Sequence, residues 1–150
     1  MPKPSRYRQD QAERQALSTY LKLTRMSDRL WDRLALGLQR EGVTPSQFGV
    51  LEALFHLGPM CQRDLGERIL RSSGNMTMVI GNLARRGLVR RERSTEDRRY
   101  HQVHLTAQGE RLVRRVFPRH AAAITRELSV LTREEQRALG HLCRKLGAVS

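Results

Sequence analysis

The sequence predicts a mainly α-helical protein with one small β-hairpin, an α+β fold. Apolar residues recur at helical spacing over most of the 150 residues, and Thr44, Thr106 and Thr132 each precede a new helical run. The spacing changes between residues 88 and 105, where two short runs typical of strands flank a polar turn. A helical scaffold with a single hairpin follows.

The first predicted helix runs from Gln11 to about Arg40, with no Pro or Gly before Gly37. Thirty residues at about 1.5 Å per residue give a helix of roughly 45 Å, longer than one small domain covers. Its apolar positions also spread over a wide arc. We therefore expect part of this helix to contact a second chain.

The stretch "TPSQFGVLEALFHLGP" predicts a helix from Pro45 to about Leu57, with Thr44 and Gln47 as a capping box and Gly58-Pro59 as its end. We expect Phe48, Leu51, Leu54 and Phe55 to be buried, with Val50 and Leu57 at the margins. A short helix in "CQRDLGERIL" should turn Leu65 and Ile69 inward. A break at "RSSG" then leads into "NMTMVIGNLARRG", which completes a helix-turn-helix.

The helix after "RSSG" has two unlike faces. Met76, Val79, Ile80 and Leu83 cluster on the buried side, and the outward side carries no acid and is thinned by Gly81. A helix of this kind can enter a major groove, where Met78 would contact a thymine methyl group and four polar residues would address base edges, namely Asn75, Thr77, Asn82 and Arg85. We expect backbone N–H groups at Ser72, Ser73 and Gly74 to bind a phosphate oxygen.

The hairpin is very basic. Residues 88–93 and 100–105 form its strands, and Ser94 to Arg99 form its turn. It carries Arg90, Arg91, Arg93, Arg98 and Arg99, of which we expect Arg91, Arg98 and Arg99 to contact DNA, with Asp97 holding Arg99 in position. A recognition helix in the major groove and a basic hairpin reaching the adjacent minor groove define a winged helix-turn-helix.

Two further helices follow the hairpin. Thr106 caps the first, which Pro118 should kink, and Thr132 with Glu135 opens the last, to about Lys145. Cys143 shares an apolar side with Leu139, Leu142 and Leu146, so we expect a buried thiol. Cys61 and Cys143 are far apart in the sequence, which indicates neither a disulfide framework nor a cysteine-based zinc site.

A net charge of +13 favours a polyanionic partner. No apolar run approaches the ~18 residues of a membrane span, and "MPKPSRYRQDQAERQ" lacks a signal-peptide core, so we expect a cytoplasmic protein. Nucleophile, phosphate-loop and zinc-protease motifs are absent, and the five histidines show no ligand spacing, His101 and His104 pointing to opposite faces of a strand. We expect no enzymatic activity, no cofactor and no metal site.

The motifs resemble those of the multiple antibiotic resistance regulator (MarR) family of bacterial winged-helix repressors. The resemblance runs from about Leu17 to the C-terminus and is densest between Thr44 and Gly109. Beyond the two helices of the helix-turn-helix, it rests on "EDRRYHQVHLTAQG", which contains the wing signature D-x-R and then L-T-x-x-G. The motif residues are Asp97, Arg99, Leu105, Thr106 and Gly109.

The resemblance implies a single domain over residues 1–150, with a winged helix-turn-helix at 44–106 and dimerisation helices at 11–42 and 107–150. It further implies a homodimer that binds a pseudo-palindromic operator, represses transcription and is released by a small, often phenolic ligand. The ligand cleft would be lined by Trp31, Leu34, Phe55, His56 and Phe117.

Two alternatives stay open. Cys61 occupies a helix N-cap where relatives place Ser or Thr, and such a position can activate a thiol, so a redox-responsive regulator is one of them. The peroxide-sensing branch, however, uses a cysteine near the start of the first helix, where this sequence has none. The other is a nonspecific nucleic-acid-binding protein that relies on charge alone, although few aromatic residues are available to stack on bases.

Overall fold

The computed structural model describes residues 10–69 and 75–148. The chain divides into two compact units, residues 1–33 and 34–150, and the boundary falls inside the first helix, α1 (Gln11–Arg40). The predicted long helix is therefore confirmed in its extent. In the first unit, Leu17, Tyr20, Leu21 and Met26 are exposed apolar side chains on α1. The assignment of dimerisation to residues 11–42 and 107–150 stays a prediction.

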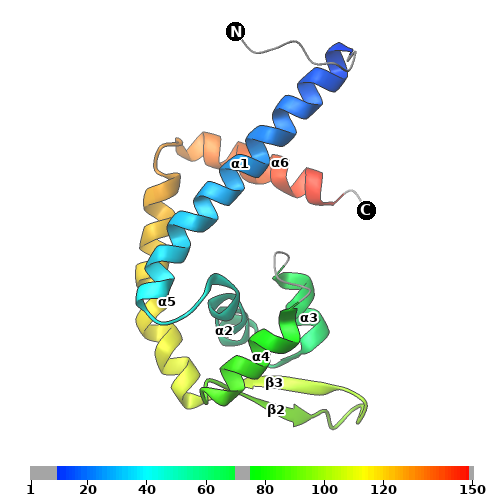
Figure 1. Cartoon of the computed structure of the whole chain (residues 1–150), viewed down its shortest axis with the longest axis vertical. Helices are drawn as coiled ribbons and strands as arrows, with labels where there is room; N and C mark the ends of the chain where they lie inside the picture. Colours follow the sequence, from blue (N-terminus) through cyan, green and yellow to red (C-terminus); the bar gives the residue numbers. More distant parts are fainter. Residues whose placement is uncertain (1–9, 70–74, 149–150) are drawn as a thin grey trace. The chain divides into compact units, whose positions relative to one another are not determined.

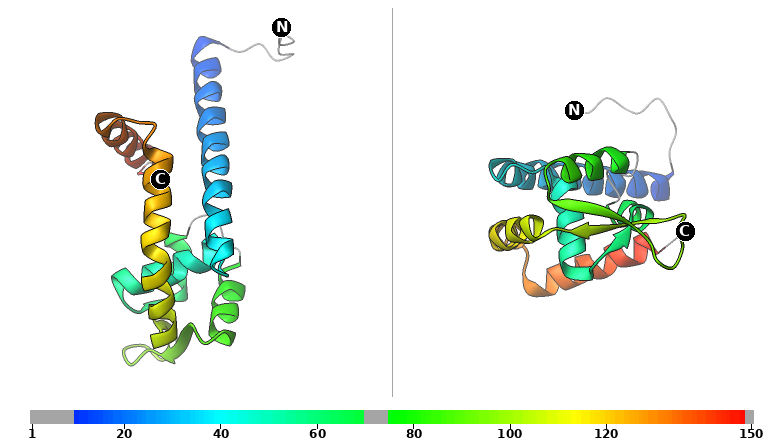
Figure 2. Two further views of the ribbon diagram at one scale, coloured as in Figure 1. Left: turned by 90° about the vertical axis from the view of Figure 1, so that its left-hand side faces the viewer. Right: turned by 90° about the horizontal axis from the view of Figure 1, so that it is seen from below.

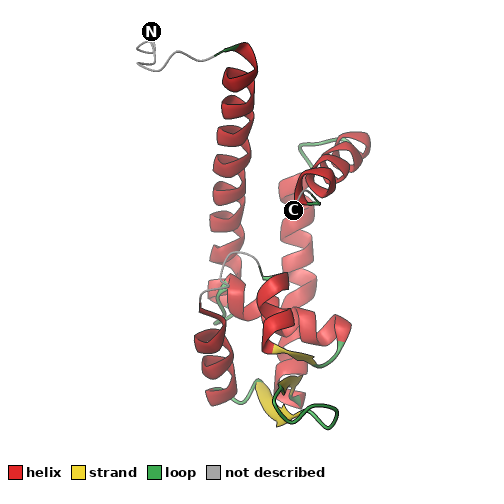
Figure 3. Ribbon diagram, turned by 90° about the vertical axis from the view of Figure 1, so that its right-hand side faces the viewer, coloured by secondary structure: helices red, strands yellow, loops and turns green. Residues whose placement is uncertain are grey.

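The second unit is built from helices around one small sheet (Figures 1 and 3). Its elements after α1 are α2 (Pro45–Leu57), β1 (Met60–Cys61), α3 (Gln62–Arg68), α4 (Met76–Arg85), β2 (Val89–Arg93), β3 (His101–Leu105), α5 (Ala107–Leu128) and α6 (Arg133–Gly147). Every predicted helix and both hairpin strands are confirmed. The helix α5 continues through Pro118.

The sheet is antiparallel, with the strand order β1-β3-β2. Val89 lies opposite Leu105 and Arg93 opposite His101, which confirms the hairpin and places its turn at residues 94–100. The two-residue strand β1 was not expected. It pairs with β3 through Met60 and Val103 and so attaches the hairpin to the start of α3.

One apolar core joins α2, α3, α4, the sheet and the first half of α5. Its most deeply buried side chains include Phe48, Val50, Leu51, Leu65, Ile80, Leu83, Val103, Val113 and Val116. The prediction for α2 was right for Phe48, Leu51 and Leu54 but wrong at the margins. Val50 is fully buried, Phe55 is only half-buried and Leu57 is exposed, because neighbouring elements cover both sides of the helix at its start but not at its end.

The hairpin, α4 and α5 meet at one junction. The Thr106 backbone N–H donates to the Leu88 carbonyl at 3.1 Å, and its hydroxyl donates to the Gly87 carbonyl at 2.7 Å. The same hydroxyl accepts from the Gly109 N–H at 3.0 Å and caps α5. A Cβ at Gly109 would overlap the carbonyl oxygen of Leu88. Only glycine lets the first turn of α5 approach this closely.

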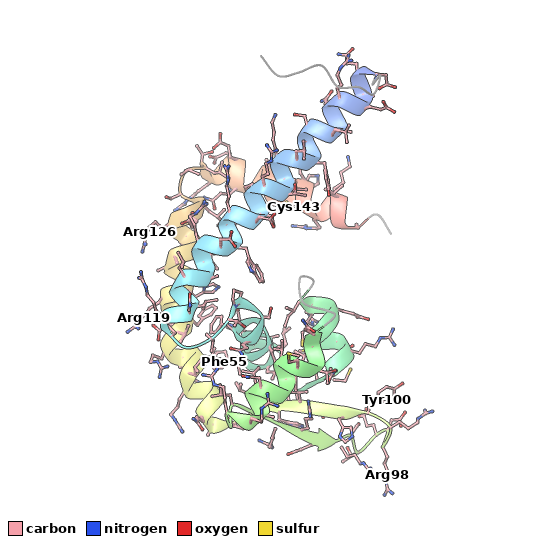
Figure 4. All side chains as sticks on the ribbon, viewed as in Figure 1. Phe55, Arg98, Tyr100, Arg119, Arg126 and Cys143 are labelled. Carbon is pink, nitrogen blue, oxygen red and sulfur yellow. The ribbon has the colours of Figure 1, made fainter. Side chains whose placement is uncertain are left out.

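The helix α6 lies at the other end of α5 from the hairpin, as the left view of Figure 2 shows. Thr132 and Glu135 form the expected capping box. The prediction of a buried Cys143 was wrong, because this thiol is exposed, as Figure 4 shows on α6. Leu142 and Leu146 are exposed as well, since no described element of the second unit covers this face.

Replacing Gly109 by Ala should destabilise the protein by about 1–3 kcal/mol or more, because the added methyl group collides with backbone that cannot move without displacing the wing. Urea unfolding followed by circular dichroism measures the change. Gly37→Ala is the matched control, since a Cβ at that helical position meets no atom within 4 Å among the described residues. The control should be neutral or slightly stabilising. Equal stability of the two variants would contradict the close approach.

His120 gives a pH-dependent contribution to stability. Its ring packs edge-on against Phe48 with centroids 5.2 Å apart, and burial lowers its pKa, against a smaller opposing effect of Glu52. The unfolded chain therefore binds a proton near pH 6.5, before the folded chain does. Stability should be fully present above pH 6.5 and should fall as the pH drops through the lowered folded pKa.

We expect His120→Gln to lose less thermal stability than the wild type between pH 7.5 and pH 5, measured as the difference in Tm. The exposed His101 serves as a control: His101→Gln should lose as much as the wild type over the same interval. An identical loss in all three proteins would show that His120 does not contribute.

Candidate nucleic-acid interface

The helix α4 is anchored by one face and open on the other. Met76, Ile80 and Leu83 are buried against α2, α3 and β2, as the spacing predicted. Asn75, Thr77, Met78 and Arg85 are exposed on the opposite side, and Met78 keeps 67% of its surface accessible. No acidic residue occurs in the helix. This face can approach a polyanion without a repulsive charge of its own.

Two glutamines from neighbouring helices hold polar side chains of α4. Gln62 on α3 donates through Nε2 to the hydroxyl of Thr77 at 2.6 Å. Gln47 on α2 donates through Nε2 to Oδ1 of Asn82 at 3.1 Å. From the sequence, Gln47 was predicted only as a capping residue, and neither of these two hydrogen bonds to α4 was predicted. No local sequence pattern predicts a contact between residues 35 positions apart.

The hairpin carries exposed arginines at its turn. Arg98 and Tyr100 project from the tip of the β2–β3 loop (Figure 4), and both are exposed. Arg91 is exposed on β2, and its guanidinium lies near Gly81 of α4, 3.8 Å from where a Cβ would be. Arg91 and Arg98 have no ion-pair partner within residues 10–69 and 75–148. Their charge is available to a ligand.

Asp97 holds Arg99, as the sequence predicted. Its Oδ1 accepts from Arg99 Nε at 3.1 Å and from the Arg99 backbone N–H at 3.0 Å, while Oδ2 accepts from the second guanidinium nitrogen at 3.0 Å. The side-chain hydrogen bond from Arg99, with the backbone one after it, lowers the pKa of Asp97 and keeps this carboxyl ionised. The guanidinium therefore has a fixed pose on an exposed turn.

Arg90 is committed within the hairpin. It donates to Glu92 at 2.6 Å, and His104 lies 3.3 Å from the other oxygen of the same carboxylate. The Arg90 hydrogen bond lowers the pKa of Glu92. The hairpin therefore carries both a paired arginine, Arg90, and arginines without an ion-pair partner among the described residues, Arg91 and Arg98, a difference that the arginine count alone did not reveal.

A further basic hollow lies behind α4. It has a volume of about 210 Å³ and is lined by Arg86, Leu88, Gln108, Arg111, Leu112 and Arg115. Arg115 is partly neutralised by Glu41 at 3.6 Å, and Glu41 also accepts from Arg119 at 2.5 Å. This cluster was not predicted from the sequence, because its residues come from the connection between α4 and β2 and from α5.

The residues proposed for a ligand cleft are only partly brought together. His56 packs edge-on against Phe55 at 5.0 Å and Phe117 at 4.9 Å between ring centroids, and the Arg114 guanidinium lies 5.1 Å from the Phe55 centroid. Leu34 is half-buried in the same unit. Trp31 belongs to the first unit.

Of the remaining predicted sites, Ser72, Ser73 and Gly74 lie outside the described residues. Cys61 is the N-cap of α3 and is half-buried, and it makes no side-chain capping hydrogen bond, as expected of a poorer cap. Within the described part of the chain, no three His, Cys, Asp or Glu side chains are grouped as metal ligands. No helix there has the length and apolarity needed to cross a membrane.

An open, acid-free helix beside a basic hairpin on a helical scaffold defines a winged helix-turn-helix protein. Comparison with known proteins agrees. The model described as "MarR family" matches residues 43–101. The HTH-type transcriptional regulator MhqR of Bacillus subtilis is 32% identical over 132 residues, which cover 88% of this chain and 91% of MhqR. The chain belongs to the MarR family of transcriptional regulators.

Solved structures of the family share the fold. Sco3205, a MarR family regulator from Streptomyces coelicolor crystallised in complex with DNA, superimposes with a TM-score of 0.81 at 26% identity, covering 96% of this chain and 91% of Sco3205. PcaV from the same organism, in complex with its natural ligand, gives 0.70 at 29% identity, covering 87% and 90%. The family and these relatives are transcriptional regulators, which confirms that the chain is not an enzyme.

Proposed function

We propose that the protein is a homodimeric repressor that binds a pseudo-palindromic DNA operator and is released by a small ligand. The observation that carries the proposal is the exposed face of α4, held by two glutamines and placed in one unit with the unpaired arginines of the hairpin. The DNA complex of Sco3205 supports the use of this fold on DNA. Such a protein would act in the cytoplasm, associated with the nucleoid while bound.

The proposed DNA contacts divide by role. Asn75, Thr77, Asn82 and Arg85 would address base edges and Met78 a thymine methyl group, since α4 presents them on or beside its open face. Arg91, Arg98 and Arg99 would contact the backbone and the minor groove, and Asp97 would fix Arg99. Ser72, Ser73 and Gly74 complete the proposal at the start of α4 on the evidence of the sequence alone.

We propose ligand control around the aromatic group of Phe55, His56 and Phe117, with Leu34 of the same unit. Trp31 completes the proposal on the evidence of the sequence alone. The aromatic rings in the second unit, which pack edge-on, suit a flat aromatic or phenolic molecule. PcaV, which has been solved with its natural ligand, supports control by a small molecule in this fold.

The first test is fluorescence anisotropy with a duplex taken from upstream of the protein's own gene and a scrambled duplex, at one physiological salt concentration. A sequence-specific, autoregulating repressor should prefer the upstream duplex by about 10³ or more. In the same titrations Arg99→Ala should weaken binding by about 1–3 kcal/mol, because the fixed guanidinium is lost.

Arg137→Ala is the matched control for Arg99→Ala. Arg137 is an exposed arginine on α6, paired with Glu134, and α6 lies at the opposite end of α5 from the hairpin. Its replacement by Ala removes the same charge as Arg99→Ala. It should leave affinity within about 0.5 kcal/mol of the wild type. Equal binding of both duplexes by the wild type would indicate a charge-driven, nonspecific binder instead.

A dimer should form through the exposed apolar residues of α6 and α1. Leu142 and Leu146 keep 59% and 62% of their surface accessible on a helix that is otherwise strongly charged. The double variant Leu142→Glu/Leu146→Glu should sediment as a monomer at concentrations where the wild type is a dimer. Leu57→Glu, at a similarly exposed position on α2, should stay dimeric. A monomeric wild type would contradict the proposal.

A further inference from the structure

We propose that Asn82 selects a base that offers a hydrogen-bond acceptor in the major groove and rejects cytosine, because Gln47 fixes its side-chain amide with the NH₂ group facing outward. The proposal rests on the proposed function, in that it assumes that α4 enters the major groove. It adds the chemical identity of the base edge that one side chain selects and names Gln47 as the positioning residue.

The amide of Gln47 has one possible orientation. Its Oε1 lies 3.0 Å from the backbone nitrogen of Thr44 and 3.5 Å from a guanidinium nitrogen of Arg86. Both groups are donors only, since a backbone N–H and a guanidinium have no lone pair to offer. The atom that faces them must therefore be the carbonyl oxygen, and Nε2 occupies the other position.

This orientation determines that of Asn82. Gln47 Nε2 is a donor and lies 3.1 Å from the nearer amide atom of Asn82, which must accept and is therefore Oδ1. Turning the Asn82 amide would oppose two NH₂ groups. The Thr44 backbone N–H thus determines the orientation of the Gln47 amide and, through it, that of the Asn82 amide. Without such a neighbour, the oxygen and nitrogen positions of a side-chain amide are ambiguous. The Asn82 Nδ2 makes no hydrogen bond to residues 10–69 or 75–148.

The outward group is thus a donor without an acceptor beside it among the described residues. In the major groove guanine offers the acceptors N7 and O6, thymine offers O4 and adenine offers N7, whereas cytosine offers only its amino group, which is a donor. Two donors cannot pair, so the outward NH₂ group admits guanine, thymine or adenine and rejects cytosine.

The position of Asn82 suits this role. It is half-buried at the margin of α4, one side against the start of α2 and the other toward the open face that carries Met78 and Arg85. Gln47 is itself held at both ends of its amide, as a capping residue of α2 and as a donor to α4. Neither amide can turn without losing a hydrogen bond.

The test is selection of bound sequences from a pool of randomised DNA duplexes by the full-length protein, followed by sequencing. The wild type should deplete cytosine at the position in each half-site that Asn82 contacts. The variant Asn82→Ala identifies this position, because discrimination there should fall about tenfold or more while the other positions keep theirs.

Gln47→Glu reverses the outward group. A carboxylate still accepts from the Thr44 N–H, so the capping box and the start of α2 are kept. Its second oxygen can only accept, and Asn82 must turn its amide to donate, which leaves Oδ1 outward. Cytosine should then be accepted at that position, and the preference there should change toward an amino base, adenine or cytosine, by about tenfold or more.

Asn82→Asp gives an independent route to the same change. The aspartate still accepts from Gln47 Nε2 and presents a second acceptor to the groove, so it should also favour an amino base. Gln39→Glu is the charge-matched control, since Gln39 is exposed on α1 within the second unit and carries no side-chain hydrogen bond to a described residue. It should lower overall affinity at most and leave the selected sequence unchanged.

An unchanged base preference in Gln47→Glu and Asn82→Asp, with both variants folded by circular dichroism, would overturn the inference. Should Gln47→Glu fail to fold, the result for Asn82→Asp decides. Selection of cytosine by the wild type at the Asn82 position would also overturn it and leave the proposed function standing. Enrichment of no sequence by the wild type would overturn the proposed function, and this inference with it.

Discussion

The contact between the first turn of α5 and the backbone of Leu88 is the constraint on which the interface depends. Gly109 allows it by having no side chain, and Thr106 secures it with hydrogen bonds to Gly87 and Leu88. The end of α4, the start of β2, the end of β3 and the start of α5 all lie within this junction. The hairpin therefore cannot pivot on α4 without breaking hydrogen bonds to the start of α5. The Thr and Gly of the L-T-x-x-G motif are the residues that make this contact possible.

With one end of α4 fixed at this junction, the glutamine bridges fix its polar side chains. Gln62 and Gln47 reach α4 from two different helices, at Thr77 and at Asn82. Side chains held in this way lose little conformational freedom on binding, so less of the interaction energy is spent on ordering them. The same rigidity makes the direction of each donor and acceptor a property of the free protein.

Helix starts could be predicted from the sequence because their signals are local. Thr44 with Gln47, Thr106, and Thr132 with Glu135 each bond to a backbone group three residues away, and all three starts are confirmed. The strand β1 could not, since two residues carry no periodicity and the strand exists only through its pairing with β3. The exposure of Cys143 could not be predicted either, because an apolar stripe on a helix does not indicate whether another part of the same chain covers it.

The candidate site shows the same division. Alternation and helical spacing identified which residues of α4 and the hairpin point outward, and the spacing of Asp97 and Arg99 indicated their ion pair. The net charge did not indicate which surface is the candidate site. Four arginines are each paired with a nearby carboxylate, namely Arg63, Arg90, Arg114 and Arg137. Arg85, Arg91 and Arg98 have no such partner among the described residues, and all three lie on α4 or the wing. Pairing, unlike net charge, is a property of the folded chain, so the sequence could not predict which arginines are paired.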